Sequence, residues 1–136
     1  MRKRGLYFLA AAMLALAWSM LPVESGEAVE LARVLYANCA QQTDETMRVF
    51  GSVIVNRVGL REYGNTLGQV LAGFESGTYF DGRALEIARA LCEGKRSFDA
   101  APAEVVHAVH VSEDHSGYEE LGFWRMCGEY AFYYRT

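Results

Sequence analysis

The sequence has few residues that break a fold and few cations that could bind phosphates. Its 136 residues include only two prolines, and no low-complexity segment or internal repeat is present. From residue 26 onward there are ten positive and sixteen negative side chains, a balance of −6 without any basic cluster. We therefore expect no nucleic acid as a partner. The apolar fraction of 51% fits one small globular domain and excludes a disordered or fibrous protein.

The first 25 residues have the pattern of an export signal. Residues 2–4 are all basic, and residues 6–21 follow as sixteen positions with a single polar side chain. This predicts a signal peptide over residues 1–25. An uncleaved membrane anchor is the alternative, because residues 6–23 approach the roughly 20 apolar residues that span a bilayer. In both cases the domain of residues 26–136 is exported, and it is either secreted or attached to the outer face of the cytoplasmic membrane.

The cysteine count is odd, with Cys39, Cys92 and Cys127. An exported protein can then form one disulfide at most, leaving one free thiol, and the sequence does not select the pair. The alternative is that all three are small buried residues. A thiol hydrolase that pairs Cys39 with a histidine is a weaker possibility, because Cys39 lies on an apolar helical stripe where thiols are inert.

The three histidines do not form a metal site in the expected fold. His107 and His110 point to opposite faces of one expected strand, so they cannot bind the same ion. His115 lies in a polar turn beside two acidic residues, where a solvated side chain is the usual state. No metal and no cofactor are therefore predicted.

The apolar spacing predicts helices first and a small antiparallel sheet second, an α+β domain. The second helix is apolar almost all round, so it should form the centre of the core. Thr43, the pair Asn65-Thr66 and Asp81 are suited to cap the starts of three helices, and Gly94 to stop the last one. After Pro102 the apolar period changes to two, as in strands. The expected helices run over about 28–40, 43–57, 65–73 and 81–94, and the strands over 105–111 and 130–134.

Several motifs in the chain occur in the order known from one protein family. Leu31-Ala32-Arg33-Val34-Leu35-Tyr36-Ala37-Asn38 is followed by Val53-Ile54-Val55-Asn56-Arg57-Val58, with Asn56 eighteen positions after Asn38. Tyr63-Gly64-Asn65-Thr66-Leu67 then leads into Val70-Leu71, and an Ala-rich segment ends at Gly94. Cys127-Gly128-Glu129-Tyr130-Ala131-Phe132-Tyr133 lies at the end. Over residues 29–134 this series resembles the SleB-type cell wall hydrolase family, with Gly64 in place of the family's proline.

The resemblance implies a lysozyme-like domain that acts on peptidoglycan glycan strands as a lytic transglycosylase. In that mechanism one glutamate protonates the glycosidic oxygen and then acts as base while the muramic C6 hydroxyl closes an anhydro ring. The family's glutamate position holds Asn38 here, and the second acidic position holds Gln42. An amide cannot deliver the proton, and loss of a general acid reduces the rate by about 10²- to 10⁴-fold.

Other residues in the same region are candidates for binding or for a substitute acid. Glu75 lies where the resemblance places a substrate loop, so it is the candidate substitute acid. Asn38 and Gln42 can hydrogen-bond sugar hydroxyls and N-acetyl groups. Tyr79 and Phe80 can stack on sugar rings, or they can belong to a satellite core.

The sequence therefore leaves two functions open. One is an exported cell wall hydrolase homologue with weak or lost activity. The other is a non-catalytic peptidoglycan-binding or regulatory pseudoenzyme of the same fold. Asn56 and Arg57 also match the family, but we expect them to stabilise the fold, Asn56 by satisfying buried backbone groups and Arg57 by pairing with a carboxylate.

Overall fold

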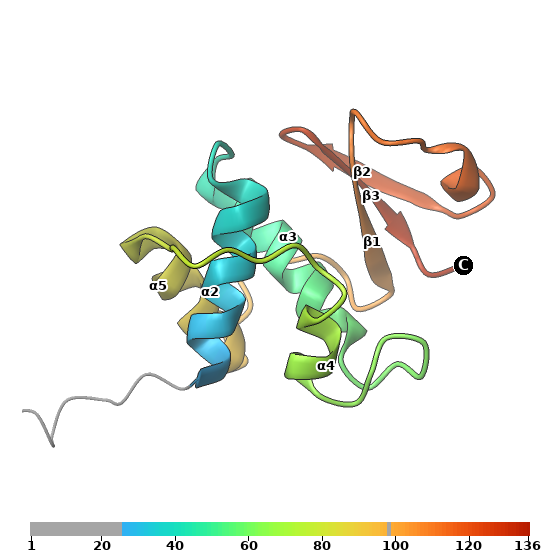
Figure 1. Cartoon of the computed structure of the whole chain (residues 1–136). Helices are drawn as coiled ribbons and strands as arrows, with labels where there is room; N and C mark the ends of the chain where they lie inside the picture. Colours follow the sequence, from blue (N-terminus) through green and yellow to red (C-terminus); the bar gives the residue numbers. More distant parts are fainter. Residues whose placement is uncertain (1–25, 98) are drawn as a thin grey trace, which may run out of the picture.

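The computed structural model describes residues 26–97 and 99–136, and in these ranges four α-helices precede a three-stranded antiparallel sheet (Figure 1). This confirms the α+β class and the order of elements. The signal peptide or anchor expected in residues 1–25 lies outside the described residues. Within the described ranges, none of the helices has the length and apolarity needed to cross a membrane. The elements are α2 Gly26–Cys39, α3 Asp44–Arg57, α4 Leu67–Leu71, α5 Gly82–Cys92, β1 Val105–His110, the 3₁₀-helix η1 Ser116–Tyr118, β2 Phe123–Cys127 and β3 Tyr130–Tyr134.

Three helices begin at the capping side chains that the sequence predicted. The Thr43 hydroxyl accepts a hydrogen bond from the backbone N–H of Thr46 at 3.2 Å, and the Asp81 carboxylate accepts one from Ala84 at 2.8 Å. Thr66 forms a reciprocal capping box with the third residue of α4. These bonds satisfy N–H groups that a helix start leaves without an internal partner.

Helix α3 is the centre of the core, as its composition predicted. It contacts α2, α4, α5, β1 and β2, and Figure 1 shows it between α2 and the sheet. Its side chains Met47, Val53 and Ile54 are fully buried. Near its C-terminal end, Asn56 donates hydrogen bonds to the carbonyls of Pro102 at 2.8 Å and Val105 at 3.0 Å. The expectation that Asn56 satisfies buried backbone groups is therefore confirmed.

Arg57 differs from the expectation, because it pairs with none of the described carboxylates. Its Nε donates to the carbonyl of Val106 at 2.7 Å, and its guanidinium lies over the rings of Tyr63 at 4.3 Å and Phe74 at 4.8 Å. Burial lowers the pKa of Arg57, and the negative ring faces together with the carbonyl compensate part of the lost hydration. Arg57 thus joins α3 to β1 and to the loops on both sides of α4.

The sheet has the strand order β1-β3-β2, with both neighbouring pairs antiparallel. Strand β2 was not among the predicted strands, because its register shifts between Phe123 and Arg125 and the alternation of side chains is lost there. Phe132 faces the helical core and is fully buried. On β3 the next residue, Tyr133, stacks on Tyr118 of η1 with ring centroids 5.4 Å apart. The 3₁₀-helix therefore covers part of the outer face of the sheet.

The turn before α4 shows a local departure from the resembled family. Gly64 has a φ of +129°, and a Cβ at this position would collide with the side chain of Gln69. Proline is fixed near a φ of −65°, so it cannot adopt this backbone conformation. The chain here requires glycine, and the turn follows a different path from one built on proline.

Candidate functional site

Asn38, at the position of the family's glutamate, ties a loop to helix α2. It lies half-buried in the last turn of α2. Its Nδ2 donates to the carbonyl of Val34 at 2.8 Å and to the carbonyl of Glu75, in the loop after α4, at 3.0 Å. Both amide hydrogens are thus used, whereas Oδ1 accepts no hydrogen bond from the described residues. Asn38 can accept a hydrogen bond from a ligand but has no proton to transfer.

Gln42 and Glu129 hold the β2–β3 turn against the α2–α3 turn. Gln42 Nε2 donates to Oε2 of Glu129 at 3.1 Å, and Gln42 Oε1 accepts from the Glu129 backbone N–H at 3.1 Å. Gly128 permits this approach, because its φ of +56° is left-handed and a Cβ there would collide with the side chains of Gln42 and Thr46. Two segments 87 residues apart in sequence therefore share one polar cluster.

His110 completes this cluster from the end of β1. Its Nε2 lies 3.0 Å from Oε2 of Glu129, the same oxygen that Gln42 contacts. The hydrogen bond from His110, followed by that from Gln42, holds the pKa of Glu129 below its usual range. Glu129 is therefore ionised at neutral pH, so it can accept hydrogen bonds but cannot act as a general acid.

Tyr130 connects Asn38 to the His110–Glu129 pair. Its hydroxyl donates to the carbonyl of Asn38 at 2.7 Å, and its ring lies 5.2 Å from the ring of His110. Burial raises the pKa of Tyr130, which keeps the hydroxyl protonated. We call the group of Asn38, Gln42, His110, Glu129 and Tyr130 the α2-end site.

The other residues suggested by the sequence differ in how they relate to the α2-end site. Tyr79 is 62% exposed, and its ring meets Tyr36 of α2 edge-on at 4.9 Å, so one aromatic face is held in place beside the C-terminal half of α2. Phe80 is half-buried and packs against the core. Glu75 is exposed and reaches Asn38 only through its backbone carbonyl. Sequence reasoning named Glu129 only as part of the C-terminal motif and gave it no role, because its contacts with Gln42 and His110 join segments that are distant in sequence.

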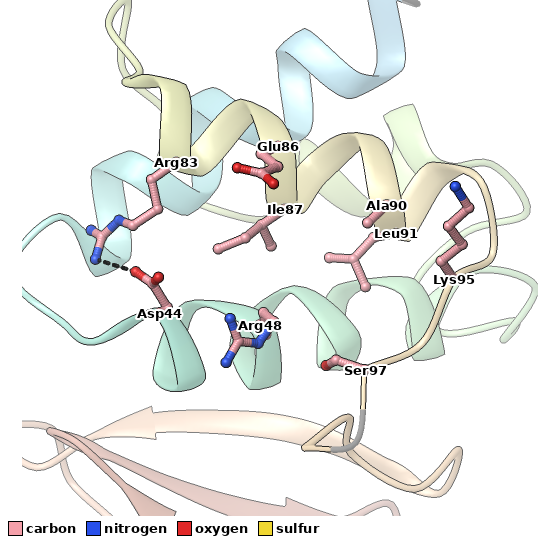
Figure 2. Close-up of a pocket in the computed structure, with 9 residues that line it drawn as sticks. All are labelled: Asp44, Arg48, Arg83, Glu86, Ile87, Ala90, Leu91, Lys95 and Ser97. Atoms are coloured by element: carbon pink, nitrogen blue, oxygen red, sulfur yellow. Dashed lines mark hydrogen bonds and ion pairs between the residues drawn. The ribbon is translucent and has the colours of Figure 1, made fainter.

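A separate pocket lies between α3 and α5, with a volume of about 220 Å³ (Figure 2). The two arginines on its rim are paired: Arg83 bonds Asp44 at 3.2 Å, and Arg48 bonds Asp99 at 3.0 Å. Arg83 also donates to the carbonyl of Gln42 at 2.8 Å, which stabilises the turn after α2.

The cysteines are free thiols, and two of the three are buried as expected. Cys39 and Cys127 are buried, but Cys92, the last residue of α5, is exposed, so the expectation of burial is wrong for it. Burial raises the pKa of Cys39 to about 12, which keeps this thiol protonated and argues against a thiol hydrolase. Among residues 26–97 and 99–136, no three His, Cys, Asp or Glu side chains gather as a metal-binding group.

Fold and site together define a small α+β domain with a polar and aromatic site at the C-terminal end of α2. Comparison of the chain with protein-family models, curated proteins and solved structures finds no match.

Proposed function

We propose that this protein is an exported peptidoglycan-binding protein of SleB-like, lysozyme-like build that holds glycan strands without cleaving them. The observation that carries the proposal is the state of Asn38. At the position where the resembled family has its acid, both amide hydrogens are donated to backbone carbonyls. The side chain therefore has a structural role and offers one free acceptor atom.

The surroundings of Asn38 suit recognition of a sugar. Oδ1 of Asn38 and the carboxylate of Glu129 can accept hydrogen bonds from hydroxyl and N-acetyl groups. Tyr79 offers an exposed ring whose orientation Tyr36 fixes, and such rings bind the apolar faces of ligands. Acceptors and an aromatic platform together favour a binding role.

Residual cleavage is the second candidate function, and Glu75 is the observation that favours it. Its backbone carbonyl is fixed 3.0 Å from the Asn38 amide, so its carboxylate is attached next to the position of the missing acid. Glu129 does not serve this purpose, because His110 and Gln42 keep it ionised. A weak lytic transglycosylase would therefore depend on Glu75.

The proposal is tested by sedimenting the full-length chain with purified sacculi. The matched variants are Tyr79→Ala and Phe123→Ala, since the two aromatic residues are 62% and 55% exposed. Of the two, only Tyr79 lies in the loop after α4 that Asn38 holds. Loss of one stacked ring should weaken binding about three- to tenfold. We expect that loss for Tyr79→Ala alone; absence of binding by the natural chain, or equal losses in both variants, would contradict the proposal.

A further inference from the structure

Arg33, in the middle of α2, has a buried donor without a partner. Among the described residues, its Nε is the one buried side-chain nitrogen or oxygen that makes no hydrogen bond. The side chain is half-buried, and no carboxylate of the described chain pairs with it. The enclosed Nε is out of reach of a ligand, but the terminal nitrogens of the guanidinium are not enclosed and form no hydrogen bond with the described residues, so they are the donors that a ligand can meet.

Arg33 lines a groove of about 300 Å³ between α2, α4 and the loop after α4. The groove walls come partly from small residues, Gly68 and Ala72 of α4 and Ser76 of the loop, which leave room for a ligand. The groove also adjoins the α2-end site, because Val34 lines it and gives its carbonyl to Asn38. A ligand that occupies the site can therefore extend along α2 toward Arg33.

We propose that this groove binds a single carboxylate on a substituent of the glycan strand, with Arg33 as its partner. The inference rests on the proposed peptidoglycan binding and names the chemical group that the groove recognises. A guanidinium presents its N–H groups as a planar fork, which matches the two oxygens of a carboxylate. Glu30 also lines the groove, and its charge disfavours doubly charged anions such as phosphate monoesters. In peptidoglycan the lactyl-peptide substituent of the muramic residue carries such carboxylates, whereas the N-acetylglucosamine backbone carries none.

The test compares two ligands on the full-length chain by isothermal titration calorimetry. One is a disaccharide-peptide released from the cell wall, which has free carboxylates, and the other is uncharged chitotetraose. The variants are Arg33→Met, which keeps an apolar stem of similar length, and Arg33→Lys, which keeps the charge without the fork. Arg61→Met is the control, because Arg61 is exposed, lies in the turn after α3 and does not line the groove.

We expect Arg33→Met to weaken binding of the disaccharide-peptide about tenfold, which is the effect of losing one charge-assisted hydrogen bond, and to leave chitotetraose binding unchanged. The affinity of Arg33→Lys for the disaccharide-peptide should lie between those of Arg33→Met and the natural chain, and the affinity of Arg61→Met should equal that of the natural chain. Glu30→Gln should tighten the disaccharide-peptide, a gain that a purely structural role of Arg33 does not produce.

Two results would overturn the inference in different ways. If the natural chain binds both ligands and neither Arg33→Lys nor Glu30→Gln changes the affinity for the disaccharide-peptide, the groove is not a carboxylate site and the proposed function stands. If the natural chain binds neither ligand, the proposed function fails and the inference that depends on it fails with it. Because these two variants keep the charge or the shape of the groove, the test does not depend on whether Arg33→Met folds.

Discussion

Replacing Asn56 with alanine tests how α3 is joined to the sheet. The Asn56 side chain is only 9% exposed and makes three hydrogen bonds. Two are donated to the carbonyls of Pro102 and Val105, and the third is accepted from the guanidinium of Arg96 at 2.8 Å. Alanine removes all three bonds and leaves the carbonyl of the buried Val105 without this partner in the core, whereas Pro102 and Arg96 are exposed residues.

The expected loss follows from the type of each bond. A neutral hydrogen bond contributes about 1 kcal/mol and one to a charged group about 1.5–3 kcal/mol, so Asn56→Ala should destabilise the fold by roughly 3–5 kcal/mol. For a domain of this size, about 4 °C of melting temperature corresponds to each kcal/mol, so the midpoint should fall by roughly 12–20 °C. A loss of this size is a large part of a typical folding free energy.

Urea denaturation followed by circular dichroism measures the change directly. Asn56→Asp has nearly the same volume but places an oxygen against two carbonyls, so it should also be strongly destabilised, which separates lost hydrogen bonds from a simple cavity. Asn65→Ala is the control, because the Asn65 side chain is exposed, and its effect should stay within about 0.5 kcal/mol. A loss below 1 kcal/mol for Asn56→Ala would refute the reasoning.

Three further predictions concern charge, thiol reactivity and the loop held by Asn38. Burial alone would raise the pKa of Asp99, but hydrogen bonds from Arg48 and Ser97 outweigh it and hold the pKa below its usual range. The ionised carboxylate therefore stabilises the fold above about pH 4, and this contribution disappears as the pH falls through the lowered pKa. Over this pH interval, acid titration of Asp99→Asn should show a smaller loss of stability than titration of the natural chain. In native protein at pH 8, iodoacetamide should alkylate the exposed Cys92 first and leave Cys39 unmodified, as peptide mass spectrometry will show; modification of Cys39 at an equal rate would contradict its burial. Asn38→Ala removes two hydrogen bonds and should cost about 1–2 kcal/mol while speeding amide hydrogen exchange in residues 75–80, and unchanged exchange there would mean that the side chain does not hold the loop.

The helical half of the fold could be predicted because its signals are local. Thr43 and Asp81 each bond to an N–H three residues ahead, so a cap is visible in a short stretch of sequence. The apolar composition of α3 likewise predicted its central position. Strand β2 was missed because the register shift at Phe123 breaks the alternation that identifies strands.

The site could be predicted only in part, since its geometry depends on contacts between distant segments. The resemblance drew attention to Asn38 and Gln42, but no sequence pattern shows that Gln42 meets Glu129 across 87 residues. Arg57 illustrates the same limit: its partners are a carbonyl of β1 and two aromatic rings from other segments, not a carboxylate. The lysozyme-like architecture and the action on peptidoglycan stay predictions, supported by the motif order and by the chemistry of the α2-end site.

The most direct test of the central claim is to incubate the full-length chain with sacculi and with spore cortex fragments. The bound fraction is measured by sedimentation, and the released muropeptides by mass spectrometry. The account predicts that the natural chain sediments with the glycan and releases no anhydro-muramic ends, because Asn38 cannot protonate the glycosidic oxygen. Release of anhydro-muramic ends by the natural chain, abolished in Glu75→Gln, would contradict it and identify Glu75 as the acid.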